Sequence, residues 1–347
     1  MVKKQSSSKQ KPSKPKQSAL TSETPTALDR VPQLSQKQQQ RLLDIFSQAF
    51  GQVLSAENFA GLLQEIKQAL YNRDFATAFG REDYLEAYAA RWSPTRALAY
   101  ASVFLYITDH IISNVVTTPD PGSGDGGSLK MLCVGGCAAE QLAFASYLHE
   151  TSYTGRLTLL DSAPWSKVVS HLQSGITTAP TLSKYASAAT KSSNVALLDP
   201  AAVSVNFVQE DVLALNQKQL VELAGAGPLL VTLLFTLNEL YTYGGLAKTT
   251  KLLRQLGQAL PNGSLLLVVD SPGSYSEVAV GQEKKRYPMA WLLHHTLQET
   301  KDIEYSWEKL ESHDSIWFRL PEGLVYPIPL ENMRYQMHLY RLLQTPS

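Results

Sequence analysis

Cysteine, charge and long apolar runs are all scarce in this sequence. The two cysteines among 347 residues, Cys133 and Cys137, have no further cysteine and no histidine cluster near them. They do not form a metal-binding pattern, so we expect two small core residues and no bound metal. No apolar run is long enough to cross a bilayer, and the start of the chain lacks the apolar stretch of a secretory signal. We therefore expect an intracellular protein with no membrane partner.

Charged side chains make up only 18% of the residues and cancel to a net charge of zero, whereas hydrophobic residues make up 44%. This composition is typical of a globular enzyme or scaffold with a substantial core. The zero hides an asymmetry, because residues 1–40 carry eight basic and two acidic side chains. We expect the Lys-, Ser-, Gln- and Pro-rich segment 1–37 to be a disordered basic tail. It could bind phosphates, act as a nuclear import address or merely aid solubility, and we favour a functional role.

The remainder divides into a helical and an alternating part. Residues 38–118 have apolar side chains at helical spacing, and we expect one long helix from Ser93 to about Val115. A Pro-, Gly- and Asp-rich linker, 119–128, precedes a second domain, 129–347. There, strands and helices alternate, which predicts an α/β fold with a largely parallel sheet. The expected strands are 129–134, 157–161, 205–211, 229–237, 264–270, 315–320 and 333–343, with a surface insertion at 173–202 and a helix at 286–300.

The most informative stretch runs from Leu129 to Asp161. An apolar strand is followed by the small-residue turn Gly135-Gly136 and by a helix that begins near Ala138. Such a turn lets the backbone approach a ligand, and the helix offers its N-terminal amides. Asp161 lies 25 residues beyond Gly136, close to the roughly 20 expected for an acid that binds ribose hydroxyls. An ordinary strand-to-helix turn remains the alternative.

Polar groups also follow the next strands, where ligands bind in open α/β sheets. An acid after the second strand suits ribose hydroxyls, and an acid after the third suits an adenine amino group, so an adenosyl cofactor is favoured. Cys137 and Ala139 stand where a dinucleotide-binding loop would carry glycines, which counts against a dehydrogenase. S-adenosylmethionine has no phosphate and tolerates a looser turn. The strand-end groups are Asp161, Asp211, and Asn238 with Glu239.

Five motifs carry a resemblance to a known family: the run from Leu129 to Glu140; Leu159-Leu160-Asp161 with Trp165; Leu237-Asn238-Glu239-Leu240; Arg91-Trp92-Ser93-Pro94 with Arg96-Ala97-Leu98; and the end of the chain, from Trp317-Phe318-Arg319-Leu320-Pro321 to Met333-Arg334-Tyr335-Gln336. They resemble the fungal methyltransferases that modify N3 of a uridine in 25S ribosomal RNA. The resemblance covers about residues 80–343, and the terminal motif is its specific part. It implies a Rossmann-like seven-stranded methyltransferase sheet, S-adenosylmethionine as methyl donor, ribosomal RNA in a pre-60S particle as substrate, and a nucleolar location.

We expect eight residues to bind the cofactor: Gly135, Gly136, Ala138, Glu140, Asp161, Ser162, Asp211 and Val212. The N3 proton of uridine must leave before or during methyl transfer, so a base or a hydrogen-bonding group is needed. We expect Asn238 and Glu239 to position the substrate and accept this proton, and Tyr241 to stack on the base. The alternative for Glu239 is a carboxylate that satisfies helix N-terminal amides. Second-line candidates are Glu331, Arg334 and His338.

Two other functions stay open. The first is a catalytically inactive methyltransferase fold that uses the basic tail to hold pre-ribosomal RNA. The second is a methyltransferase that acts on a small molecule or a protein, for which the tail would be incidental. Loss of cofactor binding would favour the former, and RNA affinity that does not depend on the tail or on salt would favour the latter.

Overall fold

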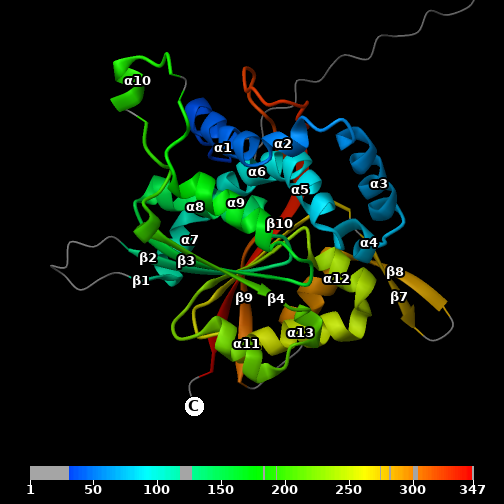
Figure 1. The fold of residues 1–347 in the computed structure, drawn as a ribbon. Helices are drawn as coiled ribbons and strands as arrows, with labels where there is room; N and C mark the ends of the chain where they lie inside the picture. The colour runs from blue at the N-terminus through cyan, green and yellow to red at the C-terminus, as the bar shows by residue number, and fades with distance from the viewer. Residues whose placement is uncertain are drawn as a thin grey trace, which may run out of the picture. The chain divides into compact units, whose positions relative to one another are not determined.

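Helices make up most of residues 36–114 in the computed structural model (Figure 1). The structure describes residues 31–117, 127–182, 184–192, 194–273, 275–280, 283–299 and 304–345. The expected basic tail lies outside these residues except for 31–37, as does most of the linker 119–128. The helices are α1 (Gln36–Ala49), α2 (Gly51–Leu54), α3 (Phe59–Tyr71), α4 (Phe75–Phe79), α5 (Glu82–Arg91), α6 (Ser93–Tyr106) and α7 (Thr108–Asn114).

The prediction of a single long helix from Ser93 to about Val115 is wrong, because Ile107 separates α6 from α7. The Ile107 backbone, at φ −92° and ψ 16°, leaves the helical range. The Thr108 hydroxyl donates to the Phe104 carbonyl oxygen over 3.1 Å. A threonine side chain that hydrogen-bonds the preceding turn competes with the backbone ladder, which accounts for the break.

A central sheet has the strand order β4-β3-β2-β5-β6-β10-β9, with the short β1 paired to β2. β2 to β6 are parallel, and β10 lies antiparallel between β6 and β9. The predicted seven-stranded Rossmann-like sheet is therefore confirmed. The strands are β1 (Val116–Thr117), β2 (Ser128–Val134), β3 (Thr154–Asp161), β4 (Val203–Gln209), β5 (Leu230–Leu234), β6 (Leu265–Asp270), β9 (Tyr305–Phe318) and β10 (Met333–Gln344).

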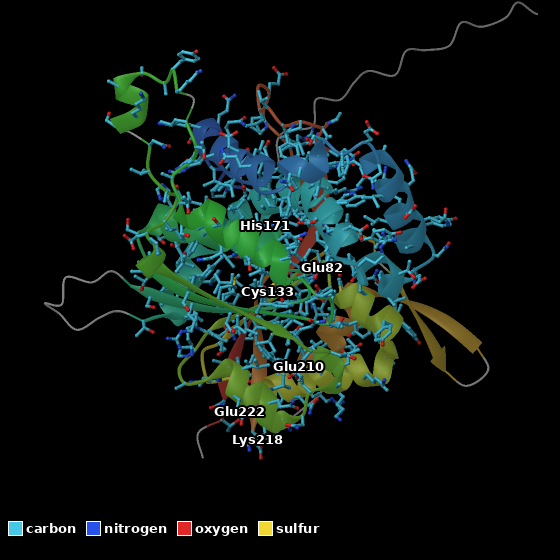
Figure 2. All side chains as sticks on the ribbon, viewed as in Figure 1. Glu82, Cys133, His171, Glu210, Lys218 and Glu222 are labelled. Atoms are coloured by element: carbon cyan, nitrogen blue, oxygen red, sulfur yellow. The ribbon has the colours of Figure 1, made fainter. Side chains whose placement is uncertain are left out.

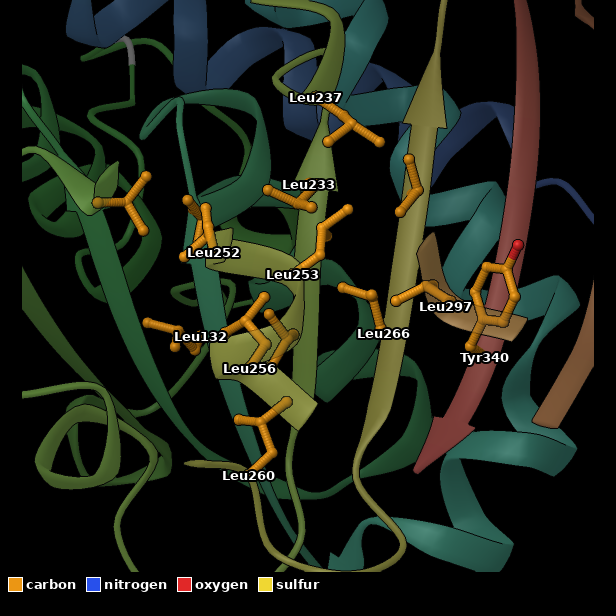
Figure 3. Close-up of a cluster of buried hydrophobic side chains, with 14 of the residues drawn as sticks. Leu132, Leu233, Leu237, Leu252, Leu253, Leu256, Leu260, Leu266, Leu297 and Tyr340 are labelled. Atoms are coloured by element: carbon orange, nitrogen blue, oxygen red, sulfur yellow. The ribbon is translucent and has the colours of Figure 1, made fainter. Parts of the chain in front are cut away.

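Helices cover both faces of the sheet (Figure 1). β5 and β6 consist of buried residues throughout, as expected for central parallel strands. On one face, Leu252, Leu253 and Leu256 pack against strand residues such as Leu233 and Leu266 (Figure 3). Burial of each such side chain contributes about 1.5–3 kcal/mol. The remaining helices are α8 (Ala139–Thr151), α9 (Ser166–Thr177), α10 (Ala188–Ser192), α11 (Gln217–Ala224), α12 (Leu237–Tyr243), α13 (Gly245–Ala259) and α14 (Met289–His294), with the short turns η2 (Pro200–Ala202) and η3 (Val212–Ala214) and the π-helix η4 (His295–Glu299).

The region after β6 differs most from the expectation. In place of one helix over 286–300, a hairpin of β7 (Tyr275–Val280) and β8 (Glu283–Pro288) precedes α14 and η4. Pro288 is extended, with φ −56° and ψ 135°, and it caps α14. Proline also biases the residue before it away from helix, so α14 cannot begin earlier. The insertion expected at 173–202 starts late as well, because α9 runs to Thr177.

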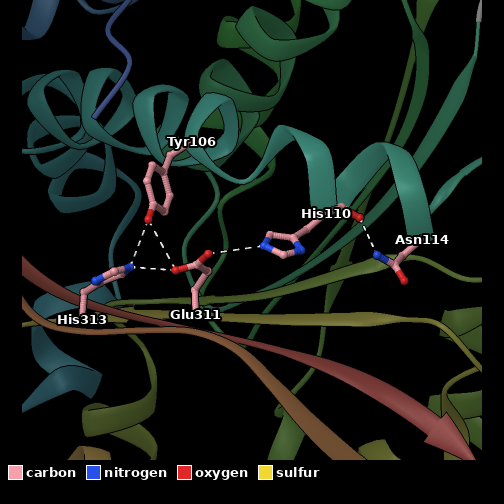
Figure 4. A network of polar contacts seen from close by, with 5 residues as sticks. All are labelled: Tyr106, His110, Asn114, Glu311 and His313. Carbon is pink, nitrogen blue, oxygen red and sulfur yellow. Dashed lines mark hydrogen bonds and ion pairs between the residues drawn. The ribbon is translucent and has the colours of Figure 1, made fainter. Parts of the chain in front are cut away.

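β9 has 14 residues rather than the six expected. Its middle section is polar and shows no apolar alternation, yet it pairs with β10 along its length. Some of these polar residues bind the N-terminal helices (Figure 4). Glu311 lies 2.9 Å from His313 and 3.4 Å from His110, and the Tyr106 hydroxyl lies 3.2 Å from His313. The helical region is thus bonded directly to the sheet, and the domain boundaries stay a prediction.

Both cysteines are free and fully buried, as predicted. Figure 2 shows Cys133 in the interior, whereas the charged side chains of Lys218 and Glu222 lie at the surface. Among the described residues, no group of His, Cys, Asp or Glu side chains is arranged to hold a metal ion. None of the helices in the described ranges is long and apolar enough to cross a membrane.

Candidate functional site

A cavity of about 560 Å³ lies at the carboxyl ends of β2, β3, β4 and β5. Its size is typical of a small-molecule site. The strand-end turns form its floor, and aromatic side chains from the N-terminal helices and from Trp165 line it as well. All eight residues expected to bind the cofactor line this cavity: Gly135, Gly136, Ala138, Glu140, Asp161, Ser162, Asp211 and Val212. Their contact with a cofactor stays a prediction.

The turn after β2 requires its two glycines. Gly135 and Gly136 have φ values of 77° and 86°, which L side chains rarely adopt. A Cβ on Gly135 would lie 2.3 Å from Cγ2 of Thr236. The Thr236 hydroxyl also donates to the Gly135 carbonyl oxygen over 3.2 Å. The turn after β2 therefore packs directly on the segment after β5, and both segments line the cavity.

Asp161 ends β3 with its carboxylate held by backbone amides. The N–H of Gly136 donates to Oδ2 over 2.7 Å, and the N–H of Ala163 donates to Oδ1 over 2.8 Å. Burial raises the pKa of Asp161, and these two N–H groups oppose the rise. Each carboxylate oxygen has a second acceptor position, so Asp161 can also accept ribose hydroxyls. Asp211 is held similarly, since its Oδ1 accepts the N–H of Leu213 over 2.9 Å.

The strand expected over 229–237 is too long. β5 ends at Leu234, and Phe235 follows with φ 60° and an N–H that donates to the Val269 carbonyl oxygen over 2.6 Å. A bulky residue in this left-handed conformation is strained, and such strain clusters at functional sites. The chain then turns into α12, so side chains three and four residues apart share a face.

Only one face of α12 lines the cavity, so only some of the expected catalytic residues reach it. Glu239 lines it, together with Thr236, Leu240 and Tyr243. Tyr241 lies on the opposite face, 2% exposed within the hydrophobic core, where it is not placed to stack on a base. Asn238 is not among the lining residues, and its backbone N–H donates to Oδ2 of Asp270 over 3.0 Å. Of the second-line candidates, His338 is fully buried and contacts Gln336 and Ser312.

Glu239 sits in an environment that disfavours its charged form. Burial raises the pKa of Glu239 to about 8. The positive charge of Arg96 opposes this rise, and the negative charges of Asp270 and Asp161 add to it. Burial likewise raises the pKa of Glu140 to about 7 and that of Asp270 to about 6. Two carboxyl groups that line the cavity, Glu140 and Glu239, therefore have pKa values close to neutral pH.

Arg96 and an aromatic cluster complete the wall. In the sequence, the cluster from Arg91 to Arg96 could face the cofactor cleft or RNA, but helix packing was the favoured interpretation, and Arg96 was not among the predicted site residues. The Arg96 guanidinium lies 4.7 Å from the ring centroid of Phe235 and hydrogen-bonds the Tyr88 hydroxyl. Tyr88 packs on Phe79 and Trp165, with ring centroids 5.1 and 6.1 Å away. Burial lowers the pKa of Arg96, but four acidic groups outweigh this and raise it: Tyr88, Tyr100, Glu140 and Glu239. The sequence feature that could have identified Arg96 is the helix start at Ser93-Pro94, because Arg96 lies in the first turn of the helix that begins there, α6.

The lining suits S-adenosylmethionine. Asp161 and Asp211 supply oriented acceptors for ribose hydroxyls and an adenine amino group, and Arg96 supplies a cation for a carboxylate. Gly136 is required in the turn for steric reasons as well, since a Cβ there would lie 2.9 Å from a Glu140 oxygen. When bound, the cofactor supplies an electrophilic methyl group, and the protein's part is to hold donor and acceptor in line.

The sequence matches the family model described as "Putative SAM-dependent methyltransferase" over residues 46–341. The chain belongs to this family. Its cofactor is S-adenosylmethionine. A curated relative from Saccharomyces cerevisiae, named 25S rRNA (uridine(2843)-N(3))-methyltransferase, is 33% identical over 304 residues, covering 80% of this chain and 76% of the relative.

Solved structures show weaker likenesses. The N-methyltransferase NodS from Bradyrhizobium japonicum, in complex with S-adenosyl-l-homocysteine, has a TM-score of 0.36 and 12% identity, over 74% of this chain and 95% of that one. A SAM-dependent methyltransferase from Methanosarcina mazei has a TM-score of 0.37 and 10% identity, over 67% and 97%. The family assignment does not depend on them.

Proposed function

We propose that this methyltransferase transfers a methyl group from S-adenosylmethionine to N3 of a uridine in large-subunit ribosomal RNA. The observation that carries the proposal is the 33% identity to the yeast enzyme over 80% of this chain, a span that must include much of the cavity. In the reaction the bond between sulfur and the methyl carbon breaks, a bond from the methyl carbon to N3 forms, and the N3 proton leaves.

Glu239 is the proposed proton acceptor. A general base works best when its pKa lies near the working pH, and the pKa of Glu239 is raised to about 8. Glu239 also lines the cavity. Among the hydrogen bonds of the described residues, none joins its carboxylate to the amides of α12. This favours a role in proton transfer over the alternative of a structural carboxylate at a helix N-terminus.

The neighbours of Glu239 take different roles from those first expected. Asn238 is a positioning residue, since its N–H binds Asp270 at the end of β6 and so fixes the start of α12. Tyr243 replaces Tyr241 as the proposed stacking surface, because it lines the cavity and is 72% exposed. A uridine inside folded RNA must leave its stack to reach this position.

The proposed substrate has consequences for partners and location. Ribosomal RNA is modified during assembly, so we propose a pre-60S particle as the physical substrate and the nucleolus as the site of action. The basic segment 1–37 would add sequence-independent affinity for RNA phosphates.

The test is methyl transfer from labelled S-adenosylmethionine to unmodified large-subunit ribosomal RNA, both free and in pre-60S particles, followed by mass spectrometry of nucleosides. We expect N3-methyluridine with the wild-type chain and much less of it, over the same time, with Glu239→Gln. Methylation of a different nucleoside, or none in either substrate, would overturn the proposal. Calorimetry then separates the alternatives: no cofactor binding points to an RNA-holding scaffold, and cofactor binding without RNA methylation points to another substrate.

A further inference from the structure

An exposed tryptophan lies beside two arginines at the end of β9. Trp317 is 50% exposed, although its neighbours Ile316 and Phe318 are each 3% exposed and belong to the core. The guanidinium carbons of Arg319 and Arg334 lie 5.7 and 5.6 Å from its ring centroid. An aromatic surface beside two cations matches the chemistry of a nucleic-acid strand, which presents flat bases and phosphates.

This cluster, Trp317 with Arg319 and Arg334, lies at the same edge of the sheet as the cavity. Trp317 pairs with Arg334 across β9 and β10, and Gln336, two residues further along, pairs with Asp270 at the carboxyl end of β6. β5, whose exit bears Glu239, and β9 are separated by three interstrand spacings, or about 15 Å. An RNA strand whose target base enters the cavity can therefore reach the cluster with nucleotides close to that base.

The cluster is held in place by its surroundings. Nε of Arg334 donates to the Ser315 hydroxyl over 2.8 Å. The segment between β9 and β10 is closed by the N–H of Leu320, which donates to Oδ1 of Asn332 over 2.9 Å. The same segment is bonded to α5, since the Tyr326 hydroxyl donates to the Ala90 carbonyl oxygen over 2.7 Å. Groups that are ordered before binding lose less entropy when a ligand arrives.

We propose that Trp317, Arg319 and Arg334 form a platform for unpaired RNA next to the target uridine, with a base stacked on Trp317 and phosphates paired with the two arginines. The proposal rests on RNA being the substrate. It assigns a role to the terminal Trp-Phe-Arg motif that the methyl-transfer site does not use.

The test compares Trp317→Ala with Trp291→Ala in the full chain. Trp291 is a matched control because it is 45% exposed but already stacked between Tyr287 and His295, with centroids 5.0 and 4.9 Å away. Fluorescence anisotropy measures Kd for single-stranded oligouridine, and steady-state kinetics measures KM and kcat for the RNA that the wild type methylates. We expect Trp317→Ala to raise Kd and KM roughly tenfold, with kcat and cofactor affinity unchanged, and Trp291→Ala to change none of these.

A double variant, Arg319→Gln with Arg334→Gln, tests the phosphate contacts independently. Loss of two contacts should reduce the slope of log Kd against log salt by about 1.4. Kd and KM for Trp317→Ala that match those of Trp291→Ala, while the wild type methylates RNA, would overturn the platform and leave the proposed function intact. The opposite result, oligouridine binding that depends on Trp317 without RNA methylation, would support the platform and overturn the proposed function.

Discussion

Two carboxylates line the same cavity but are held in opposite ways. The oxygens of Asp161 accept backbone N–H groups over 2.7 and 2.8 Å, so the turns after β2 and β3 fix it as an oriented acceptor. Glu239, on α12, is governed by burial, by Arg96 and by nearby carboxylates, and its pKa is about 8. Burial raises the pKa of both acids, but backbone amides oppose the rise at Asp161, whereas no backbone amide opposes it at Glu239. The first suits holding a cofactor, and the second suits moving a proton.

The largest effect is expected at Glu239. Glutamine has nearly the same shape but cannot accept a proton, so Glu239→Gln should lower the rate of methyl transfer by roughly 10²–10⁴-fold. Single-turnover transfer to RNA measures this rate. Calorimetry is the control, because Asp161 and the glycine turn are unchanged and cofactor affinity should stay close to that of the wild type. A rate within a few-fold of the wild type would exclude Glu239 as the base.

The pH dependence sharpens the same contrast. A base acts in its deprotonated form, so kcat/KM should rise with pH up to about 8 and then level off. Stability should move the other way. Burial raises the folded-state pKa of Glu239 above its value in the unfolded chain, so its contribution to stability is present at low pH and is lost as pH rises through about 8. In Glu239→Gln, kcat/KM should no longer rise with pH in this range. The difference in thermal stability between the variant and the wild type should shift in favour of the variant between pH 5 and pH 9.

Asp161→Ala should weaken cofactor binding about 10- to 100-fold, because a hydrogen bond to a charged group contributes about 1.5–3 kcal/mol. The change also leaves the N–H groups of Gly136 and Ala163 without their acceptor. Asp199→Ala is a matched control, since Oδ1 of Asp199 accepts the N–H of Ala201 over 2.8 Å in η2, away from the lining residues. Equal cofactor affinity of the two variants in calorimetry would remove Asp161 from the proposed site.

Gly135→Ala tests the contact between the turn after β2, which binds Asp161, and Thr236, which precedes the helix that carries Glu239. The new Cβ would lie 2.3 Å from Thr236, whereas Gly227, with a similar φ of 76°, has open space around it. Both substitutions place an alanine in a left-handed conformation, which destabilises the fold, but only the alanine at position 135 must also displace a neighbouring side chain. Gly135→Ala should therefore cost about 1–3 kcal/mol more free energy of unfolding than Gly227→Ala. Urea denaturation measures both, and equal losses would show that the turn can relax.

The residues that line the cavity at the ends of β2 and β3 could be predicted from sequence because their signals are local. A glycine turn, the helix after it and an acid 25 residues on belong to one strand-helix-strand unit. Arg96 and Tyr88 could not be placed in the same way, because they come from helices well upstream and reach the cavity only through tertiary packing. The length of β9 was underestimated for a related reason: Glu311 and His313 in its middle section bind Tyr106 and His110 of the N-terminal helices, so the apolar alternation typical of a strand is missing.

The other error came from one boundary. The strand expected to reach Leu237 ends at Leu234, and the left-handed Phe235 leads into a helix that places Glu239 and Tyr243 on one face. Tyr241 was expected to stack because it follows the end of this strand, but the helix turns its side chain into the core.

The smallest effect tests that helical face. Tyr243 is 72% exposed, so Tyr243→Ala should fold normally and raise KM for RNA about five- to tenfold through lost stacking, with cofactor affinity unchanged. Tyr241→Phe removes only a hydroxyl in the core and should leave KM unchanged while altering thermal stability slightly. The two variants lie two residues apart on one helix, so a difference between them reports the direction of the side chains rather than damage to α12. A larger change in KM for Tyr241→Phe would mean that α12 turns its other face to the substrate, and Glu239 would then no longer be placed beside the base.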